Sequence, residues 1–275
     1  NETISTPFGA GNGLPQARTS LAATESNSYG YFAGGQAPPS VCTIDRLDFS
    51  NETISDIGDL SQVSIGLAGV SGGASYRISG SRTYGYFGGG GIDPSSPPPD
   101  FDYLATVDRI DFSNETFSAP GNNLSQARSN LAATESNSYG YFAGGFVPPQ
   151  VCTIDRLDFS NETISDIGDL SQARSALAAV SSSSYGYFGG GNPNTVLVNR
   201  LDFSNETFSA PGNNLSQARN NLAATESNSY GYFAGGNYAI ATVDRLDFSN
   251  ETTSAPGSTM PYSTHGGGIA AFSSN

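Results

Sequence analysis

The stretch SNSYGYFAGG, residues 136–145, occurs letter for letter again at residues 26–35 and 227–236. Looser copies stand between these three, RTYGYFGGG at residues 82–90 and SSYGYFGGG at residues 183–191. Self-similarity at a nearly constant spacing is typical of repeat architectures. The chain is therefore predicted to consist of one repeated unit.

The repeated unit has a fixed order of segments. After each YGYF tetrad come a loop of variable length, a segment like IDRLDFSNETIS, a Pro/Gly turn and a segment like LSQARSNLAA. Short runs rich in β-branched and aromatic residues, bounded by Gly, Pro, Asn and Ser, favour strands joined by turns. We predict four strands per unit, in the third unit at residues 131–136, 138–145, 153–160 and 162–168. The tetrads begin at Tyr29, Tyr84, Tyr139, Tyr185 and Tyr230, so the spacings are 55, 55, 46 and 45 residues.

The second predicted strand carries apolar bulk on both of its faces. Tyr139, Tyr141 and Ala143 point to one side of the strand, whereas Gly140 and Phe142 point to the other. A sheet with two apolar faces lies between neighbours rather than against water. A four-stranded unit of this length matches a blade, so the fold class is predicted to be an all-β propeller.

Paired glycines close the second strand in each unit. Successive glycines let the backbone leave the sheet at positive φ and approach the adjacent blade closely, where a Cβ atom would collide. A phosphate-binding loop would need a helix N-terminus directly after the glycines, and no helix is predicted there. The repetition therefore indicates an architectural role.

The pattern resembles the kelch family of β-propellers. The segment ARSNLAATESNSYGYFAGG from Ala127, with VDRIDFSNETFS from Val107 in the preceding unit, follows the order of a kelch blade. The Tyr of the family's third strand and the Trp of its fourth strand are absent. The blades also resemble repeats in structural or adhesion-like proteins of marine phages and bacteria. These resemblances imply a propeller fold, but the fold does not supply a function.

Alternation along the chain predicts an even number of blade positions. Units with LAATESNSYGYFAGG alternate with units that end their second strand in YGYFGGG. The chain begins with NETIS, like a fourth strand, and ends with GGGIAAFSSN, like a first strand. We therefore expect six blade positions in one domain, residues 1–275, five of them full and one partial, in a chain that could be a fragment of a longer protein. The repeat units are predicted at about residues 1–50, 51–113, 114–160, 161–204, 205–249 and 250–275.

The charge balance excludes one class of partner. The chain has 25 Asp and Glu against 11 basic residues, all of them Arg, for a net charge of −14. A nucleic-acid backbone is excluded as a partner on this ground. No apolar run is long enough to span a membrane. Cys42 and Cys152 stand in matching frames of separate units, which predicts two free, half-buried thiols.

The sequence offers little catalytic chemistry. His265 is the one histidine, so no metal site and no cofactor is predicted, and no catalytic residue is assigned. Carboxylates recur in each unit, whereas a catalytic pair needs a unique environment that separates two pKa values. The repeated carboxylates are Asp45, Asp108, Asp155 and Asp244.

Each predicted third strand carries an Arg with an Asp two residues later. We predict that such Arg and Asp side chains share a face and tie a blade to itself or to its neighbour. The arginines are Arg46, Arg109, Arg156, Arg200 and Arg245, and the aspartates are Asp48, Asp111, Asp158, Asp202 and Asp247.

The NET triplets fit the acceptor pattern for N-linked glycans. They lie where the third strand should turn into the fourth, so the simpler interpretation is a hairpin in which Asn tolerates a left-handed backbone. In a secreted eukaryotic protein these turns would be acceptors. The glycosylation candidates are Asn1, Asn51, Asn114, Asn161, Asn205 and Asn250, with Asn123 and Asn214 in NLS triplets.

Sequence divergence predicts which end of the propeller binds a partner. The loops between second and third strands differ in every unit, whereas the SNET turns at the opposite end barely vary. Binding residues are commonly carried by variable loops on a rigid frame. The loop at residues 91–105 is the strongest candidate, and an alternative role for the inter-blade arginines is to bond loop carbonyls from below. The binding candidates are Arg18, Arg128, Arg174, Arg219, Asp93, Phe101, Asp102 and Tyr103.

Three functional hypotheses follow from these observations. The first is a non-enzymatic structural or binding module, extracellular or on a virion surface, acting as a fibre, adhesin or assembly component. Its partner would be a protein, a carbohydrate or another copy of the chain. The alternatives are an intracellular kelch-type peptide adaptor and a carboxylate-based enzyme acting on glycans.

Overall fold

The structure is a computed structural model that describes residues 13–37, 39–72, 82–92, 101–210, 213–237, 240–255 and 259–260. All regular secondary structure in these ranges is β-strand, as the sequence predicts. The strands form five four-stranded antiparallel sheets, here called blades 1 to 5, and one two-stranded hairpin.

Each blade takes four strands that follow one another along the chain, and blade 2 adds a hairpin between its second and third strands. Blade 1 contains β1 (Ala22–Glu25), β2 (Tyr29–Ala33), β3 (Thr43–Asp48) and β4 (Ile54–Asp59). Blade 2 contains β5 (Ala68–Gly72), β6 (Tyr84–Gly88), β9 (Val107–Asp111) and β10 (Thr116–Ser118), with the hairpin β7 (Gly91–Ile92) and β8 (Asp102–Tyr103). Blade 3 contains β11 (Ala132–Glu135), β12 (Tyr139–Ala143), β13 (Thr153–Asp158) and β14 (Ile164–Asp169). Blade 4 contains β15 (Ala178–Ser181), β16 (Tyr185–Gly189), β17 (Val198–Asp202) and β18 (Thr207–Ser209), and blade 5 contains β19 (Ala223–Glu226), β20 (Tyr230–Ala234), β21 (Val243–Asp247) and β22 (Thr253–Ser254).

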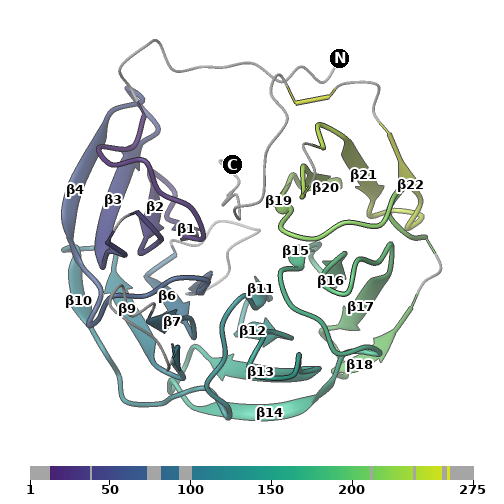
Figure 1. Cartoon of the computed structure of the whole chain (residues 1–275), viewed down its shortest axis with the longest axis horizontal. Coiled ribbons are helices and arrows are strands. Elements are labelled where there is room, and N and C mark those ends of the chain that lie inside the picture. The colour runs from purple at the N-terminus through teal and green to yellow at the C-terminus, as the bar shows by residue number, and fades with distance from the viewer. Residues whose placement is uncertain are drawn as a thin grey trace.

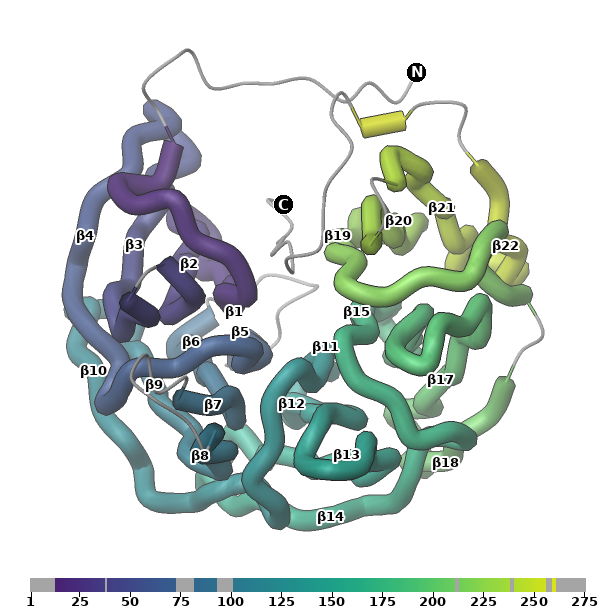
Figure 2. The backbone as a smooth tube through the Cα atoms, in the orientation of Figure 1, coloured from purple at the N-terminus to yellow at the C-terminus, as the bar shows by residue number. Residues whose placement is uncertain are grey.

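The blades stand around a common centre (Figure 1). The first strand of each blade is innermost, and the fourth strand lies at the rim. Figure 2 shows that the chain visits the blades in sequence order around the ring. This arrangement is a β-propeller, and it confirms the predicted fold class.

The core lies between blades rather than inside one sheet. The ring of Phe142 packs against blade 2, where a Cβ atom added to Gly88 would lie 2.8 Å from it. On the opposite face of blade 3, Tyr141 stacks on Phe203 of blade 4 with ring centroids 5.3 Å apart. Tyr141 and Phe142 are fully buried. The prediction that both faces of the second strand are buried against neighbours is confirmed.

The paired glycines bring neighbouring blades into backbone contact. Gly144 has a φ of 64°, and a Cβ atom there would lie 2.5 Å from the carbonyl oxygen of Arg174. The amide of Gly145 donates to the same oxygen at 2.9 Å. Both the left-handed backbone and the close approach predicted from the sequence are present.

A relay of backbone hydrogen bonds joins the five blades around the centre. The amide of Asn130, ahead of blade 3, donates to the carbonyl of Gly66, ahead of blade 2, at 2.6 Å. Equivalent bonds run from Asn221 to Ala176, from Ala176 to Asn130, and from Gly66 to Ser20. Each blade is therefore fixed to its predecessor by the same donor and acceptor.

The relay runs from blade 1 to blade 5, and within the described residues no bond of this kind joins these two blades. The predicted sixth, partial blade falls on residues 1–12 and 261–275, which lie outside the described residues. Each observed blade ends with the strand that follows a NET triplet. The boundaries of the blades therefore differ from those of the predicted repeat units. Each predicted unit begins at a NET triplet, whereas each blade ends with the strand after that triplet.

Candidate functional site

The two ends of the propeller differ in what they present. The loop face is defined here by the inter-blade segments and the loops between second and third strands, which meet in bridges such as Ser129 with Phe146 and Thr19 with Gln36. The turn face is defined by the SNET turns and the tight turns between first and second strands. The antiparallel register places these two sets of connections at opposite ends, as predicted.

Blade 2 carries an aromatic cluster on the loop face. In the hairpin β7–β8, the rings of Phe101 and Tyr103 lie with centroids 4.8 Å apart. Tyr103 also contacts Phe146 of blade 3 edge to face, at 5.9 Å. The ring of Phe101 rests on Gly91, where a Cβ atom would lie 2.2 Å from it. Other blades have Gln, Phe or Asn at the position of Gly91, so this glycine makes room for the ring.

The remaining predicted residues of this loop are placed as follows. Asp102 is exposed between the two half-buried rings. Burial raises the pKa of Tyr103. Asp93 lies outside the described residues. The structure therefore places Phe101, Asp102 and Tyr103 on the loop face.

The inter-blade arginines lie in the interior and not on the loop surface. The guanidinium of Arg128 is fully buried, forms an ion pair with Asp155 at 2.9 Å and donates to the carbonyl of Phe142 at 3.0 Å. Arg18 is paired with Asp45 at 2.7 Å, and Arg219 with Asp244 at 2.6 Å. Since these side chains are at most 1 % exposed, they correspond to the alternative role, beneath the loop and bonded to carbonyls.

Blades 2 and 4 each lack one member of this buried pair. Blade 2 has Ser64 in place of the arginine, so Asp108 has no cationic partner in the described chain, and burial raises its pKa. Blade 4 has Asn199 in place of the aspartate. Arg174 donates there to Asn199 at 2.7 Å, and burial lowers its pKa to about 10.

The NET turns are exposed hairpins with a different residue in the left-handed conformation from the one predicted. The Glu of each described triplet has positive φ, between 54° and 57°. In one turn the Oδ1 atom of Asn161 accepts bonds from the amide and the hydroxyl of Thr163, at 2.9 and 2.6 Å. The Asn therefore closes an Asx turn and does not itself adopt the left-handed backbone.

The glycosylation candidates keep their predicted surface positions. The Asn of each described NET triplet is exposed, as are those of the two NLS triplets. Asn1 lies outside the described residues. These asparagines are Asn51, Asn114, Asn123, Asn161, Asn205, Asn214 and Asn250.

The Arg of each third strand pairs with a neighbouring blade, but not with the predicted Asp. The guanidinium of Arg156 lies 2.9 Å from the carboxylate of Glu206, in the NET turn of blade 4. Asp158, two residues after Arg156, instead accepts from the amide and hydroxyl of Ser160. Tyr141 also donates to Glu206, at 3.4 Å. The arginine thus ties its blade to the next one, which is one of the two predicted alternatives, but it does so through the repeated Glu and not through the predicted Asp.

The same tie recurs at each interface between described blades. The other ion pairs are Arg46 with Glu115 at 2.9 Å, Arg109 with Glu162 at 2.8 Å and Arg200 with Glu251 at 2.9 Å. Glu52, in the NET turn of blade 1, is exposed and has no ion pair within the described ranges. The exposure of Glu52 agrees with the end of the backbone relay at blade 1.

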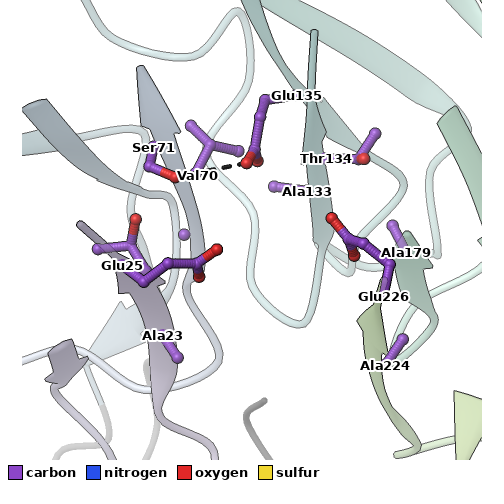
Figure 3. Close-up of a pocket in the computed structure, with 12 residues that line it drawn as sticks. Ala23, Glu25, Val70, Ser71, Ala133, Thr134, Glu135, Ala179, Ala224 and Glu226 are labelled. Atoms are coloured by element: carbon purple, nitrogen blue, oxygen red, sulfur yellow. Dashed lines mark hydrogen bonds between the residues drawn. The ribbon is translucent and has the colours of Figure 1, made fainter. Parts of the chain in front are cut away.

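Carboxylates stand at the turn-face ends of three innermost strands. Glu25, Glu135 and Glu226 come from the innermost strands of blades 1, 3 and 5 and project toward a common space (Figure 3). This space has a volume of about 60 Å³. Arg82, nearly fully buried, forms an ion pair with Glu25 and lies 3.7 Å from Glu135. Arg82 of blade 2 therefore bridges carboxylates of blades 1 and 3 beside this space.

Serines occupy the same strand position in blades 2 and 4. Ser71 donates to Glu135 at 3.4 Å, which Figure 3 shows as a dashed line. Ser181 donates to Glu226 at 3.2 Å. The carboxylates are thus distributed over three blades and are not a pair within one blade.

Two further sequence predictions concern thiols and metals. Cys42 and Cys152 are free and half-buried, as predicted, and burial is the main cause that raises both thiol pKa values. Across the ranges that the structure describes, no three His, Cys, Asp or Glu side chains are grouped to hold a metal ion. In the same ranges no helix is long and apolar enough to cross a membrane.

The class of protein that the fold defines is a β-propeller of four-stranded blades. Comparison of the chain with protein-family models and with curated protein sequences finds no match.

Proposed function

We propose that this β-propeller is a non-enzymatic structural or binding module that acts outside the cytoplasm, as part of a fibre, an adhesive surface or a virion. Its loop face contacts the partner, which is a protein, a carbohydrate or another copy of the chain. The observation that carries the proposal is the aromatic cluster of Phe101, Tyr103 and Phe146.

The aromatic cluster has the features of a binding anchor. Aromatic side chains contribute large contact areas at low cost in conformational entropy, and they dominate many interfaces. Here the ring of Phe101 packs on Gly91 and that of Tyr103 on the neighbouring blade, so binding costs little further conformational entropy. The exposed Asp102 between them adds a polar group at the rim of the same surface.

A photo-crosslinking experiment tests this assignment of the loop face. A photoreactive phenylalanine analogue is placed at Asp102, and in a matched variant at the exposed Thr163 on the turn face. Each variant is illuminated alone at rising concentration and over mucin-coated beads. We expect cross-links from position 102, and we expect Phe101→Ala with Tyr103→Ala to abolish assembly or retention. Cross-links confined to position 163 would show that the loop face is not the contact surface.

A further inference from the structure

Two hollows on the turn face are the same feature at two blade interfaces. Groove 1/2, between blades 1 and 2, has a volume of about 420 Å³, and groove 4/5, between blades 4 and 5, has a volume of about 380 Å³. Asn27, Ser28 and Tyr29 line the first groove where Ser183, Ser184 and Tyr185 line the second. Because equivalent repeat positions line both, the groove is a property of the blade interface.

The groove walls offer hydrogen-bonding groups that the fold does not use. Asn27, Ser28 and Thr83 are exposed in groove 1/2, and within the described chain their side chains make no hydrogen bond. The same holds in groove 4/5 for the exposed side chains of Ser184 and Asn228. Hydroxyl and amide groups both donate and accept, so these walls suit a ligand rich in hydroxyls.

Each groove also contains aromatic surface that the blade packing holds in place. Phe112 in groove 1/2 stacks on Tyr31 with ring centroids 5.0 Å apart and planes 15° apart. Phe248 in groove 4/5 stacks on Tyr187 at 5.6 Å and 11°. The guanidinium of Arg46 lies over the ring of Tyr29, 4.6 Å from its centroid. A ligand therefore meets a wall that is already ordered.

Each groove has one charged residue in its lining, Arg82 in groove 1/2 and Asp247 in groove 4/5, and the other polar groups are hydroxyls and amides. Hydroxyl and amide groups beside an aromatic ring match the chemistry of a sugar, which has hydroxyls at its edge and an apolar C–H face. We propose that the turn-face grooves bind a neutral polysaccharide, with one sugar residue in each groove. Serine is under-represented among the residues that dominate protein interfaces, so the serine-rich lining disfavours a protein partner. The net charge of −14 disfavours an acidic polysaccharide.

Repetition of the groove favours a repeating ligand. The sequence SNSY, which forms the groove turn in blade 1, recurs in blades 3 and 5. A single shallow groove gives weak binding, but a polymer that occupies several grooves of one rigid ring gains affinity through effective concentration. The ring thus provides multivalency within one chain.

Retention of the full chain on beads of dextran, mannan, galactan or chitin, each used separately, tests the proposal. Groove 4/5 is blocked by Ser184→Glu with Asn228→Glu, and groove 1/2 by Asn27→Glu with Thr83→Glu. These positions are exposed, so the fold tolerates the changes. We expect at least one polysaccharide to retain the wild type. In each double variant, the protein concentration that half-saturates the beads should rise about tenfold, because multivalency is lost.

The matched control adds the same charge on the loop face, as Gln126→Glu with Gln217→Glu, both at exposed positions. We expect this variant to be retained like the wild type. The proposal is overturned if no bead retains the protein, if the groove variants bind normally, or if the control loses as much binding as they do. If Phe101→Ala with Tyr103→Ala removes retention and the groove variants do not, the sugar site is on the loop face. That outcome rejects the grooves and leaves the proposed function standing.

Discussion

The loop face and the turn face both use an arginine paired with a carboxylate at 2.9 Å, yet the two pairs lie in different surroundings. On the loop side, Arg128 and Asp155 have 0 % exposed side chains and join two segments of one blade. On the turn side, Arg156 and Glu206 are 28 % and 24 % exposed and join two blades. Equal distances therefore do not imply equal contributions to the free energy of unfolding, because burial decides how strongly water competes for the charges.

The largest effect is expected from breaking the buried pair. Arg128→Ser reproduces in blade 3 the residue that blade 2 has at Ser64, and it leaves Asp155 as an unpaired buried charge. Loss of one partner of a buried pair costs about 3–5 kcal/mol of unfolding free energy. Denaturant unfolding measures the change. Adding Asp155→Asn should restore part of the loss, and a double variant no more stable than Arg128→Ser would reject the ionic explanation.

A smaller effect of opposite sign is expected in blade 2. Asp108 is buried without a cationic partner in the described chain, and burial raises its pKa above 3.8, so folding disfavours the charged form of this carboxylate. Asp108→Asn should therefore stabilise the protein at neutral pH by about 0.5–2 kcal/mol. The advantage over wild type should shrink as the pH falls through the raised pKa and vanish below about 3.8, where Asp108 is protonated in both states.

Thermal unfolding of wild type and Asp108→Asn between pH 3 and pH 8 measures this difference. Asp102→Asn is the control, because it removes one carboxylate that is exposed and not buried. An advantage of Asp108→Asn that stays constant down to pH 3 would mean that burial of the charge is not its cause.

A weaker effect is expected from the half-exposed tie on the turn face. Glu206→Gln removes the charge opposite Arg156 and keeps an acceptor for Tyr141. Partly exposed pairs contribute about 0.2–1 kcal/mol, so the loss should be of that size and should decrease in high salt. Denaturant midpoints at low and high salt measure it. A loss as large as that of Arg128→Ser would show that burial does not separate the two faces.

The sequence was sufficient to predict the fold because each blade repeats the same local signals. The YGYF runs, the closing glycines and the NET turns specify strands and turns through short-range chemistry, and the strands form where they were predicted. The two apolar faces of Tyr141 and Phe142 also predicted burial between neighbouring blades. These features depend on residue order within one unit.

Contacts between units were harder to predict, because the register of one blade against the next is not encoded along a single strand. The spacing of Arg156 and Asp158 suggested a pair on one strand face, whereas the bond goes to Glu206, 50 residues later in the sequence. The sequence feature that could have predicted this bond is the Glu in every NET triplet, because the turn itself does not require a Glu. The buried position of Arg128 had only one clue, the recurrence of an Asp in the third strand of the same blade.

The smallest effect on stability is expected at the surface proposed for binding. Comparing this effect with that of a buried ring distinguishes residues of the scaffold from residues of the binding site. Phe142→Ala removes a fully buried ring and should cost about 3–5 kcal/mol. Phe101 and Tyr103 are only half-buried, on a hairpin added to the blade, so replacing both by alanine should cost about 1 kcal/mol or less. Denaturant unfolding of the two variants beside the wild type gives the comparison. Equal losses would make the aromatic cluster part of the scaffold, whereas a small loss with abolished partner contact assigns it to recognition.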